Sequence, residues 1–183
     1  MRILAIGDFH YPDRASYPKK IFEVLKGEKF DLILCTGDLT DLKVLDDLES
    51  LGTVKIVQGN MDWNFGHPDR IIEKINGIKI GLIHGSQIRP RGDLKKLCDY
   101  AKRLNVDILI SGHTHAQSVN ICDNNKLLIN PGSATGAWSF LADRIPSFII
   151  IETDNEIIKI IKCQLKTQSL HREILEYKKS FFK

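Results

Sequence analysis

Arg2-Ile3-Leu4-Ala5-Ile6-Gly7-Asp8-Phe9-His10 joins a short apolar run to a polar loop, and the same combination recurs four more times along the chain. The run at residues 2–6 has the length and the branched side chains of a buried strand. Similar runs predict strands at residues 32–35, 55–57, 79–83 and 108–111. They are followed, in chain order, by Gly37-Asp38, Gly59-Asn60-Met61-Asp62, His84-Gly85 and Gly112-His113-Thr114-His115. Each predicted strand therefore ends in a glycine-containing loop that carries a carboxylate, an amide or an imidazole.

Apolar residues at helical spacing lie between these strands. They predict helices at residues 16–26, 41–51 and 90–104. After residue 111 the pattern changes to strands alone, at residues 118–122, 126–129, 147–152, 157–164 and 173–177. The first part indicates a mostly parallel sheet with crossover helices, and the second part adds antiparallel strands. We therefore expect an α/β fold in which two sheets pack face to face with helices outside.

The composition is that of a soluble globular protein. The 183 residues are 43% hydrophobic and 27% charged, which fits a single domain spanning residues 1–183. The net charge of +3 is too small to predict a nucleic-acid partner. Because the chain shows neither a signal-peptide core nor an apolar run of membrane-spanning length, we expect a cytoplasmic protein that meets a membrane only indirectly.

The cysteines and the end of the chain carry weaker signals. The four cysteines are widely spaced, so we expect free, buried thiols at Cys35, Cys98, Cys122 and Cys163. The basic stretch 177–183 is expected to be a solvated tail, with a weak membrane or partner contact as the alternative. His67 and His171 stand apart from the polar loops and are also expected to be solvated.

The polar loops predict a metal centre. The carboxyl ends of parallel strands converge on one crevice, so seven side chains should meet there: Asp8, His10, Asp38, Asn60, His84, His113 and His115. A lone histidine is more often structural, but five such loops in order are not explained by chance. The number of ligands suggests two ions, and mixed nitrogen and oxygen donors suit manganese, iron or zinc. Asp38 is central in this set, so its carboxylate can bridge the two ions. A pair of bridged metal ions is the usual arrangement for phosphoester hydrolysis.

The series of loops resembles the calcineurin-like metallophosphoesterases. More specifically, residues 34–37, 80–85, 106–115, 129–137, 145–148 and 176–180 resemble the small phosphoesterase-fold subunit of retromer, a part of the vacuolar protein sorting machinery. The resemblance runs essentially from end to end. It implies the two-sheet sandwich with helices on both outer faces. It also implies one divalent ion, manganese or zinc, on Asp8, His10, Asp38 and His115, and a second on Asp38, Asn60, His84 and His113.

The resemblance also implies partners. In the retromer subunit, the face around the metal pocket grips a helical-solenoid subunit, and a second apolar surface recruits regulators. This chain would then act in endosomal protein sorting, peripheral on endosome-like membranes through its partners. Trp63 and Arg91 are the residues we expect to touch a partner beside the pocket. Trp138 and Phe140 lie in another loop-like stretch, where they could equally belong to the core.

Four positions depart from the family patterns. The eukaryotic retromer subunit typically has Asn in place of Asp38 and Asp in place of Asn60, so this chain has the enzyme-like arrangement. Many phosphoesterases have a proton-donating histidine where this chain has Met61, which has no proton to donate. Many also have the sequence His-Gly-His, whereas here Ser86 takes the place of the second histidine. Asp62 is expected to orient the ligands from behind.

Two functions remain open at this point. The first is a retromer-like scaffold with a weakly active or inactive metal site, supported by the end-to-end resemblance and by Met61. The second is an active divalent-metal phosphodiesterase in which Asp38, Asn60 and His84 are the catalytic residues. A metal-stabilised fold with neither role explains less of the sequence. The stretch 130–133, Asn-Pro-Gly-Ser, is expected to be a turn beside the metal face.

Overall fold

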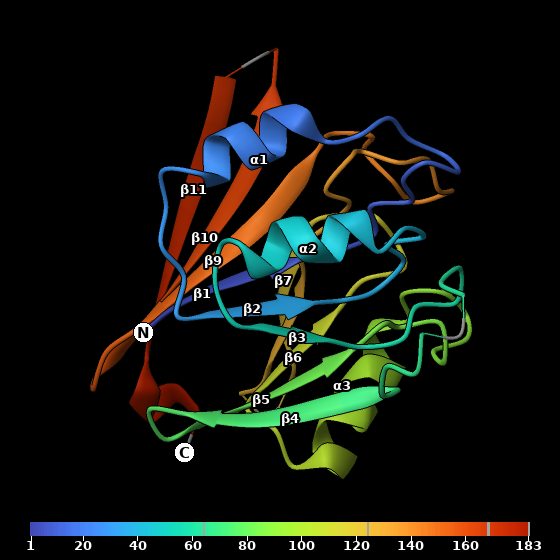
Figure 1. Ribbon diagram of the computed structural model, residues 1–183. Coiled ribbons are helices and arrows are strands. Elements are labelled where there is room, and N and C mark those ends of the chain that lie inside the picture. Colours follow the sequence, from blue (N-terminus) through green and yellow to red (C-terminus); the bar gives the residue numbers. More distant parts are fainter. Residues whose placement is uncertain (64, 124, 168, 183) are drawn as a thin grey trace.

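Two β-sheets form the centre of the molecule in the computed structural model, which describes residues 1–63, 65–123, 125–167 and 169–182 (Figure 1). The first sheet has the order β11-β10-β9-β1-β2-β3 and the second the order β4-β5-β6-β8-β7. The first sheet consists of β1 (Arg2–Ile6), β2 (Leu32–Cys35), β3 (Val54–Ile56), β9 (Ser147–Thr153), β10 (Ile157–Lys166) and β11 (Ser169–Lys178). The second consists of β4 (Arg70–Ile75), β5 (Ile78–Ile83), β6 (Ile108–Ser111), β7 (Ser118–Ile121) and β8 (Leu127–Asn130).

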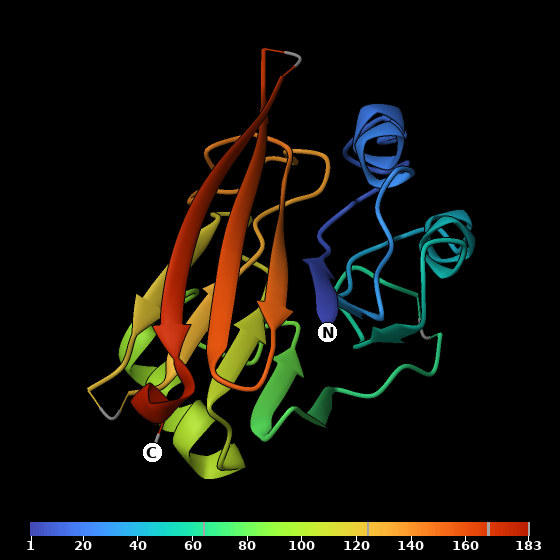
Figure 2. The same ribbon diagram turned by 90° about the vertical axis from the view of Figure 1, so that its left-hand side faces the viewer.

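Strand alternation places apolar side chains on both faces of each sheet. In β1, Ile3 and Ala5 join the core between the two sheets, whereas Leu4 and Ile6 point outward against helices. The helices α1 (Lys19–Leu25) and α2 (Lys43–Glu49) cover the outer face of the first sheet, and α3 (Leu94–Leu104) covers part of the second (Figure 2). The predicted fold of two sheets with helices outside is therefore confirmed. No helix in the described ranges is long and apolar enough to cross a bilayer.

The helices are shorter than the sequence predicts. Helix α3 starts at Leu94 instead of residue 90, because Pro90 and Gly92 lie in a loop and the Asp93 side chain caps the first turn by accepting from the Lys96 amide. It ends where predicted, before Asn105 in the left-handed conformation. Helix α1 also begins later than predicted, at Lys19.

Two regions were predicted wrongly. Strand β4 was not predicted, although it forms a hairpin with β5 through Asn76 and Gly77, both with positive φ. The chain end is not a solvated tail. Residues 179–182 form a short 3-10 helix, and Phe181 and Phe182 pack against the core between the sheets. Burial of aromatic side chains is strongly favourable, which explains why this stretch packs against the core despite its lysines.

The cysteine prediction is wrong for one pair. Cys98 and Cys122 form a disulfide, while Cys35 and Cys163 are free and buried as expected. The two bonded residues are 24 positions apart, and their Cα atoms lie 5.8 Å from each other because α3 packs beside the end of β7. Wide sequence spacing cannot reveal a pairing of this kind, which depends on how a helix crosses a sheet.

We predict that replacing both Cys98 and Cys122 by serine lowers the free energy of unfolding by about 3 kcal/mol, because the unfolded chain loses a cross-link that closes a loop of moderate length. Urea unfolding of the two proteins measures the difference. Adding a reductant should destabilise the wild type to the level of the double variant and leave the variant unchanged. A wild type that reductant does not affect would contradict the prediction.

Candidate metal centre

The seven predicted ligands come from the carboxyl ends of five strands in two different sheets. Asp8 and His10 follow β1, Asp38 follows β2 and Asn60 follows β3, all in the first sheet. His84 follows β5, and His113 and His115 follow β6, both in the second sheet. The sequence reasoning placed them along one sheet edge, whereas they face each other across the gap between two edges. The ends of these strands point to the same side of the molecule (Figure 1).

Asp38 is the middle of the cluster. Its Oδ2 lies 3.4 Å from His10 Nε2 and 3.5 Å from His84 Nε2, so one oxygen faces ligands on both sides. The side chains of all three residues are almost completely buried. A carboxylate in this position can bridge two cations, which fits the arrangement inferred for the sequence.

One set of donors lies on the His10 side. His10 Nε2 and His115 Nε2 are 3.0 Å apart, and Asp8 Oδ1 is 3.4 Å from His115 Nε2. Ligand atoms of Asp8, His10 and His115 lie within 4.8 Å of one another, close enough to share one cation. Three donors leave room for Asp38 or for water to complete the shell.

The other set lies on the His84 side. His84 Nε2 is 2.9 Å from Asn60 Oδ1 and 3.2 Å from His113 Nδ1. Ligand atoms of Asp8, Asp38 and His84 also lie within 4.8 Å of one another. The donors therefore form two adjoining groups of mixed nitrogen and oxygen atoms, which suits a pair of divalent transition ions better than calcium or magnesium.

Backbone carbonyls fix the orientation of two of the imidazole rings. The second ring nitrogen of His84, Nδ1, lies 2.8 Å from the Thr36 carbonyl oxygen, and that of His115 lies 2.9 Å from the Ala137 carbonyl oxygen. A carbonyl only accepts, so each Nδ1 carries a hydrogen, and Nε2 is the ring atom that faces the centre and can bind a cation once it carries no proton. This arrangement is the usual outer support of metal-binding histidines.

Burial sets the protonation of the remaining ligands. It lowers the pKa of His10 and of His113 to about 4. It also raises the pKa of Asp38 to about 6, against the charge of a neighbouring histidine. Burial would raise the pKa of Asp8 too, but the hydrogen bond with His115 holds that pKa below its usual value. The two histidines are therefore neutral near pH 7 and can donate lone pairs to a cation.

The backbone of the centre is strained, and sequence reasoning missed this feature. Five of the ligands have positive φ although none is glycine: Asp8, His10, Asp38, His113 and His115 have φ of 51, 50, 53, 68 and 61°. Such values cost of order 1–3 kcal/mol each and persist only where the surroundings enforce them. The packing around the loops therefore holds these side chains in a direction that the isolated chain would not favour.

Asp62 supports the centre through backbone amides. Its carboxylate accepts hydrogen bonds from the amides of Asp38, Thr40 and Gly59, at 2.9, 3.0 and 2.9 Å. These hydrogen bonds hold the loops that carry Asp38 and Asn60. The backbone amide of Met61, the residue after Asn60, donates a hydrogen bond to Asp38 Oδ1 at 2.7 Å. The Met61 thioether sulfur lies 3.6 Å from an Arg14 nitrogen.

The stretch 130–133 does more than form a turn. The Asn130 side-chain amide donates to the Gly112 carbonyl at 2.9 Å, and Ser133 Oγ donates to the Asp8 carbonyl at 2.6 Å. It thus ties together the loop before His113 and the loop of Asp8, one from each sheet. A polar side chain next to proline and glycine was the only signal for this role in the sequence.

The predicted partner residues lie at the surface. Trp63 is 76% exposed directly after Asp62, and Arg91 is exposed in the loop before α3, where its charge helps lower the pKa of His113. The Trp138 and Phe140 rings stack edge to face at 4.9 Å on the loop whose Ala137 supports His115. Trp138 and Phe140 are 48% and 86% exposed, so neither ring belongs to the core.

The isolated histidines differ from each other. His171 is exposed as expected. His67 is half-buried beside Phe65, and its Nε2 is shielded from solvent, so the prediction of a solvated side chain is wrong for this residue. An aromatic neighbour two positions away was the feature that the prediction overlooked.

Three comparisons place the chain among known proteins. Residues 1–156 match the family described as the calcineurin-like phosphoesterase superfamily domain. A probable metallophosphoesterase of Methanocaldococcus jannaschii is 46% identical over 136 residues, which is 74% of this chain and 69% of that protein.

Two solved structures are similar over nearly the whole chain. Vps29 of Entamoeba histolytica complexed with Zn²⁺ is 38% identical, with a TM-score of 0.89, and the match covers 96% of this chain and 99% of that one. Vacuolar protein sorting 29 of Cryptosporidium parvum is 32% identical, with a TM-score of 0.90 and coverage of 97% and 98%. The resemblance inferred from the sequence is therefore confirmed, and the chain belongs to the calcineurin-like phosphoesterase superfamily, with the architecture of its Vps29 members.

Proposed function

We propose that this chain is a Vps29-like scaffold subunit of a protein-sorting complex, folded as a single domain. The observation that carries the proposal is the extent of the likeness, which covers 97% of the chain at a TM-score of 0.91 in another Entamoeba histolytica Vps29 structure. Metal ligands alone would be shared with every member of the superfamily. Because 97% of the chain is covered, the likeness includes most of β10 and β11, which take no part in the metal centre.

The surface around the metal centre supports a partner-binding role. Trp63 and Phe140 expose large apolar side chains on loops that also support metal ligands. Aromatic residues of this kind are the common anchors of protein interfaces. The partner that fits the proposal is a helical-solenoid subunit of the retromer type. Regulators would bind a second surface, and the assembly would sit in the cytoplasm on endosome-like membranes through its partners.

The residues present fit two divalent cations, with manganese or zinc as the proposed ions. Asp8, His10, Asp38 and His115 would hold one, and Asp38, Asn60, His84 and His113 the other, with Asp38 between them. When bound, such ions supply positive charge for an anionic group and lower the pKa of water. The buried ligands and their outer supports would keep the loops in one conformation.

The second candidate function is a metal-dependent phosphodiesterase. The observation in its favour is the complete donor set with a carboxylate, Asp38, at the bridging position. Asn60 and His84 would position the diester beside Asp38. Such an enzyme would lack a proton donor for the leaving group, because the only donor of Met61 is its backbone amide, which is hydrogen-bonded to Asp38. A diester whose leaving group is a good one would then react, and an alkyl diester would react slowly.

The prediction that separates the two functions compares partner binding and turnover. We expect tagged wild-type protein to capture a helical-repeat protein from its native source, identified by mass spectrometry, and Arg91→Glu to weaken that binding about tenfold, or ~1.4 kcal/mol. Arg70→Glu, an exposed charge on β4, is the matched control and should bind normally. Hydrolysis of bis(4-nitrophenyl) phosphate with Mn²⁺ is measured in parallel. Robust turnover that depends on Asp38, without any such partner, would replace the scaffold by the enzyme.

A further inference from the structure

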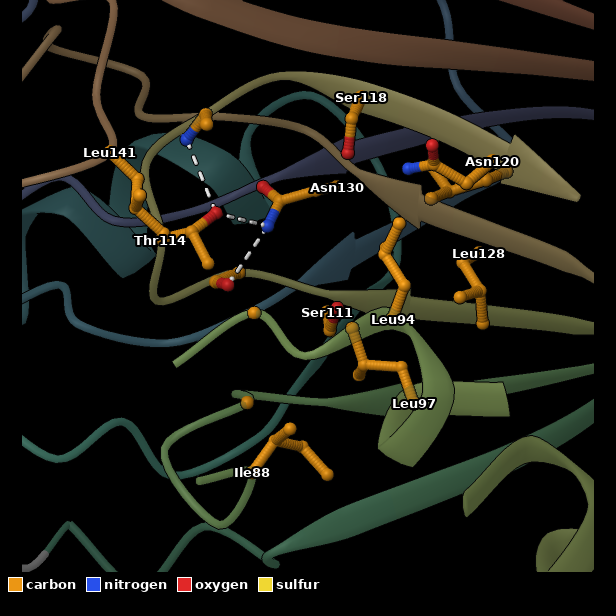
Figure 3. Close-up of a pocket in the computed structure, with 15 residues that line it drawn as sticks. Ile88, Leu94, Leu97, Ser111, Thr114, Ser118, Asn120, Leu128, Asn130 and Leu141 are labelled. Atoms are coloured by element: carbon orange, nitrogen blue, oxygen red, sulfur yellow. Dashed lines mark hydrogen bonds between the residues drawn. The ribbon is translucent and has the colours of Figure 1, made fainter. Parts of the chain in front are cut away.

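A pocket of about 300 Å³ lies on the outer face of the second sheet, beside α3 (Figure 3). Helix α3 packs over β6 and β8 through Leu97 and Ala101, whereas β7 is the edge strand beyond them. The register of the last two strands pairs Ser118 with Asn130 and Asn120 with Leu128, so these four side chains share the outer face of the sheet, where Ser118 and Asn120 stay partly exposed. The pocket is the space between them and the helix.

Most of the pocket wall is apolar. In Figure 3, Ile88, Leu94 and Leu97 approach from the loop and helix that follow β5, and Leu128 faces them from the sheet. Leu94 and Leu141 are 49% and 52% exposed although they line the pocket. Large apolar side chains left half in solvent at the edge of a cavity are typical of a binding site and unusual elsewhere on a surface.

The polar groups of the pocket are neutral, and two of them are available. Every lining residue is uncharged: Gly85, Ile88, Gly92, Leu94, Leu97, Ser111, Gly112, Thr114, Ala116, Ser118, Asn120, Leu128, Ile129, Asn130 and Leu141. Thr114 and Asn130 already bond each other at 2.9 Å. The side chains of Ser118 and Asn120, by contrast, make no hydrogen bond with another side chain or backbone group in the described parts of the chain. A hydroxyl and an amide therefore remain free to meet a ligand.

The pocket is separate from the metal centre. Gly112 lies between the two: a Cβ on this residue would point at Asp8 Oδ2, whereas its carbonyl accepts from Asn130 on the pocket side. The opposite walls of the pocket are also joined covalently, since Cys98 belongs to α3 and Cys122 follows β7. A cavity whose walls are held together in this way is formed before any ligand arrives, which reduces the cost of binding.

From these features we propose that the pocket is a binding site for a small neutral organic molecule, with an apolar ring or chain against Leu97 and Leu128 and an amide or hydroxyl group at Asn120 and Ser118. The absence of any charged lining residue argues against an anionic ligand, even though the exposed side of α3 carries four lysines and arginines. A carboxylate desolvated here would meet the Ser118 hydroxyl and the Asn120 amide but no positively charged partner. The site goes beyond the proposed scaffold function, and it adjoins the proposed partner surface, because Gly92 and Leu141 of its wall neighbour Arg91 and Phe140 in the chain.

The test uses cyclohexanecarboxamide as the probe and cyclohexanecarboxylate as its charged analogue of equal shape. Two-dimensional amide NMR spectra of the metal-saturated protein are recorded during each titration. We expect saturable shifts at Leu97, Ser118, Asn120 and Leu128 with the amide, and binding at least about tenfold weaker with the carboxylate. Equal binding of both probes, or no saturable shift at these residues up to the solubility limit, would overturn the proposal.

Variants locate the binding. Ser118→Phe places a ring in the pocket and should remove the saturable shifts, and Asn120→Leu should weaken amide binding about threefold to tenfold by removing its hydrogen-bond partner. Asn155→Leu is the matched control on an exposed turn and should bind like the wild type. Both pocket variants alter the edge strand β7, and a thermal unfolding curve shows whether each is folded. Undiminished amide binding in a folded Asn120→Leu protein would contradict the assigned contact.

Discussion

Asp38→Ala should remove both ions from the metal centre, not one. The Oδ2 atom of this residue lies 3.4 Å from His10 Nε2 and 3.5 Å from His84 Nε2, so the same oxygen serves both donor groups. Loss of an outer partner of a metal ligand already costs roughly 10–100-fold in affinity. We therefore expect the loss of this ligand to weaken Mn²⁺ or Zn²⁺ binding by more than about a hundredfold. Calorimetric titration gives the affinity and the stoichiometry together.

The Asp38→Ala protein should remain folded after EDTA has removed any metal. In the metal-free protein Asp38 is buried near Asp8, and burial together with that second carboxylate raises the pKa of Asp38 to about 6. Removing this buried charge is favourable and offsets the loss of the hydrogen bond from the Met61 amide, so the unfolding temperature measured in EDTA should change little. Asp13→Ala, an exposed carboxylate in the loop after His10, should bind both ions normally. If Asp38→Ala still binds two ions, the bridging role is wrong.

The fold could be predicted because its signals are local. Apolar runs such as Arg2–Ile6 end at glycine and a polar residue, and α-helices alternate with strands only up to Ser111. The expected change from parallel to antiparallel pairing does not follow that boundary, since β4 and β5 pair antiparallel before it and β8 pairs parallel with β6. Strand β4 was missed because Arg70, Glu73 and Lys74 interrupt its apolar residues, and only pairing with β5 compensates for its weak pattern. Edge strands in general depend on a neighbour that the sequence does not identify.

The candidate site could be predicted in its residues but not in its construction. All seven candidate ligands were predicted from polar residues that follow strand ends, and these side chains lie together in the structure. Tertiary packing brings the two sheet edges face to face and brings Cys98 next to Cys122. The hydrogen bonds from backbone amides to the Asp62 carboxylate depend on the conformation of the loops. None of these leaves a periodic trace in the sequence. The left-handed conformation of His113 and His115 is likewise imposed by their surroundings.

Gly112→Ala should disrupt the metal centre as strongly as the loss of a ligand, although Gly112 binds no metal. A Cβ atom at this position would lie 2.2 Å from Asp8 Oδ2 and 2.6 Å from Thr36 Oγ1. Both of those residues are completely buried, so neither can move aside into solvent. Asp8 would have to leave its place, where it also accepts the His113 amide at 3.0 Å. We expect loss of the ion on the His10 side and destabilisation of about 1–3 kcal/mol.

A second glycine makes this prediction specific. A Cβ atom added to Gly27, in the turn after α1, would have no other atom within 4 Å, and the residue has no positive φ. Gly27→Ala should therefore change stability by less than about 0.5 kcal/mol and leave metal binding intact. The two substitutions add the same methyl group, and only the contact with Asp8 differs. Calorimetry with Mn²⁺ and urea unfolding therefore test whether close backbone approach at Gly112 keeps Asp8 in position. Normal metal binding by Gly112→Ala would show that the Asp8 loop can shift freely, which the hydrogen bond of Ser133 to the Asp8 carbonyl argues against.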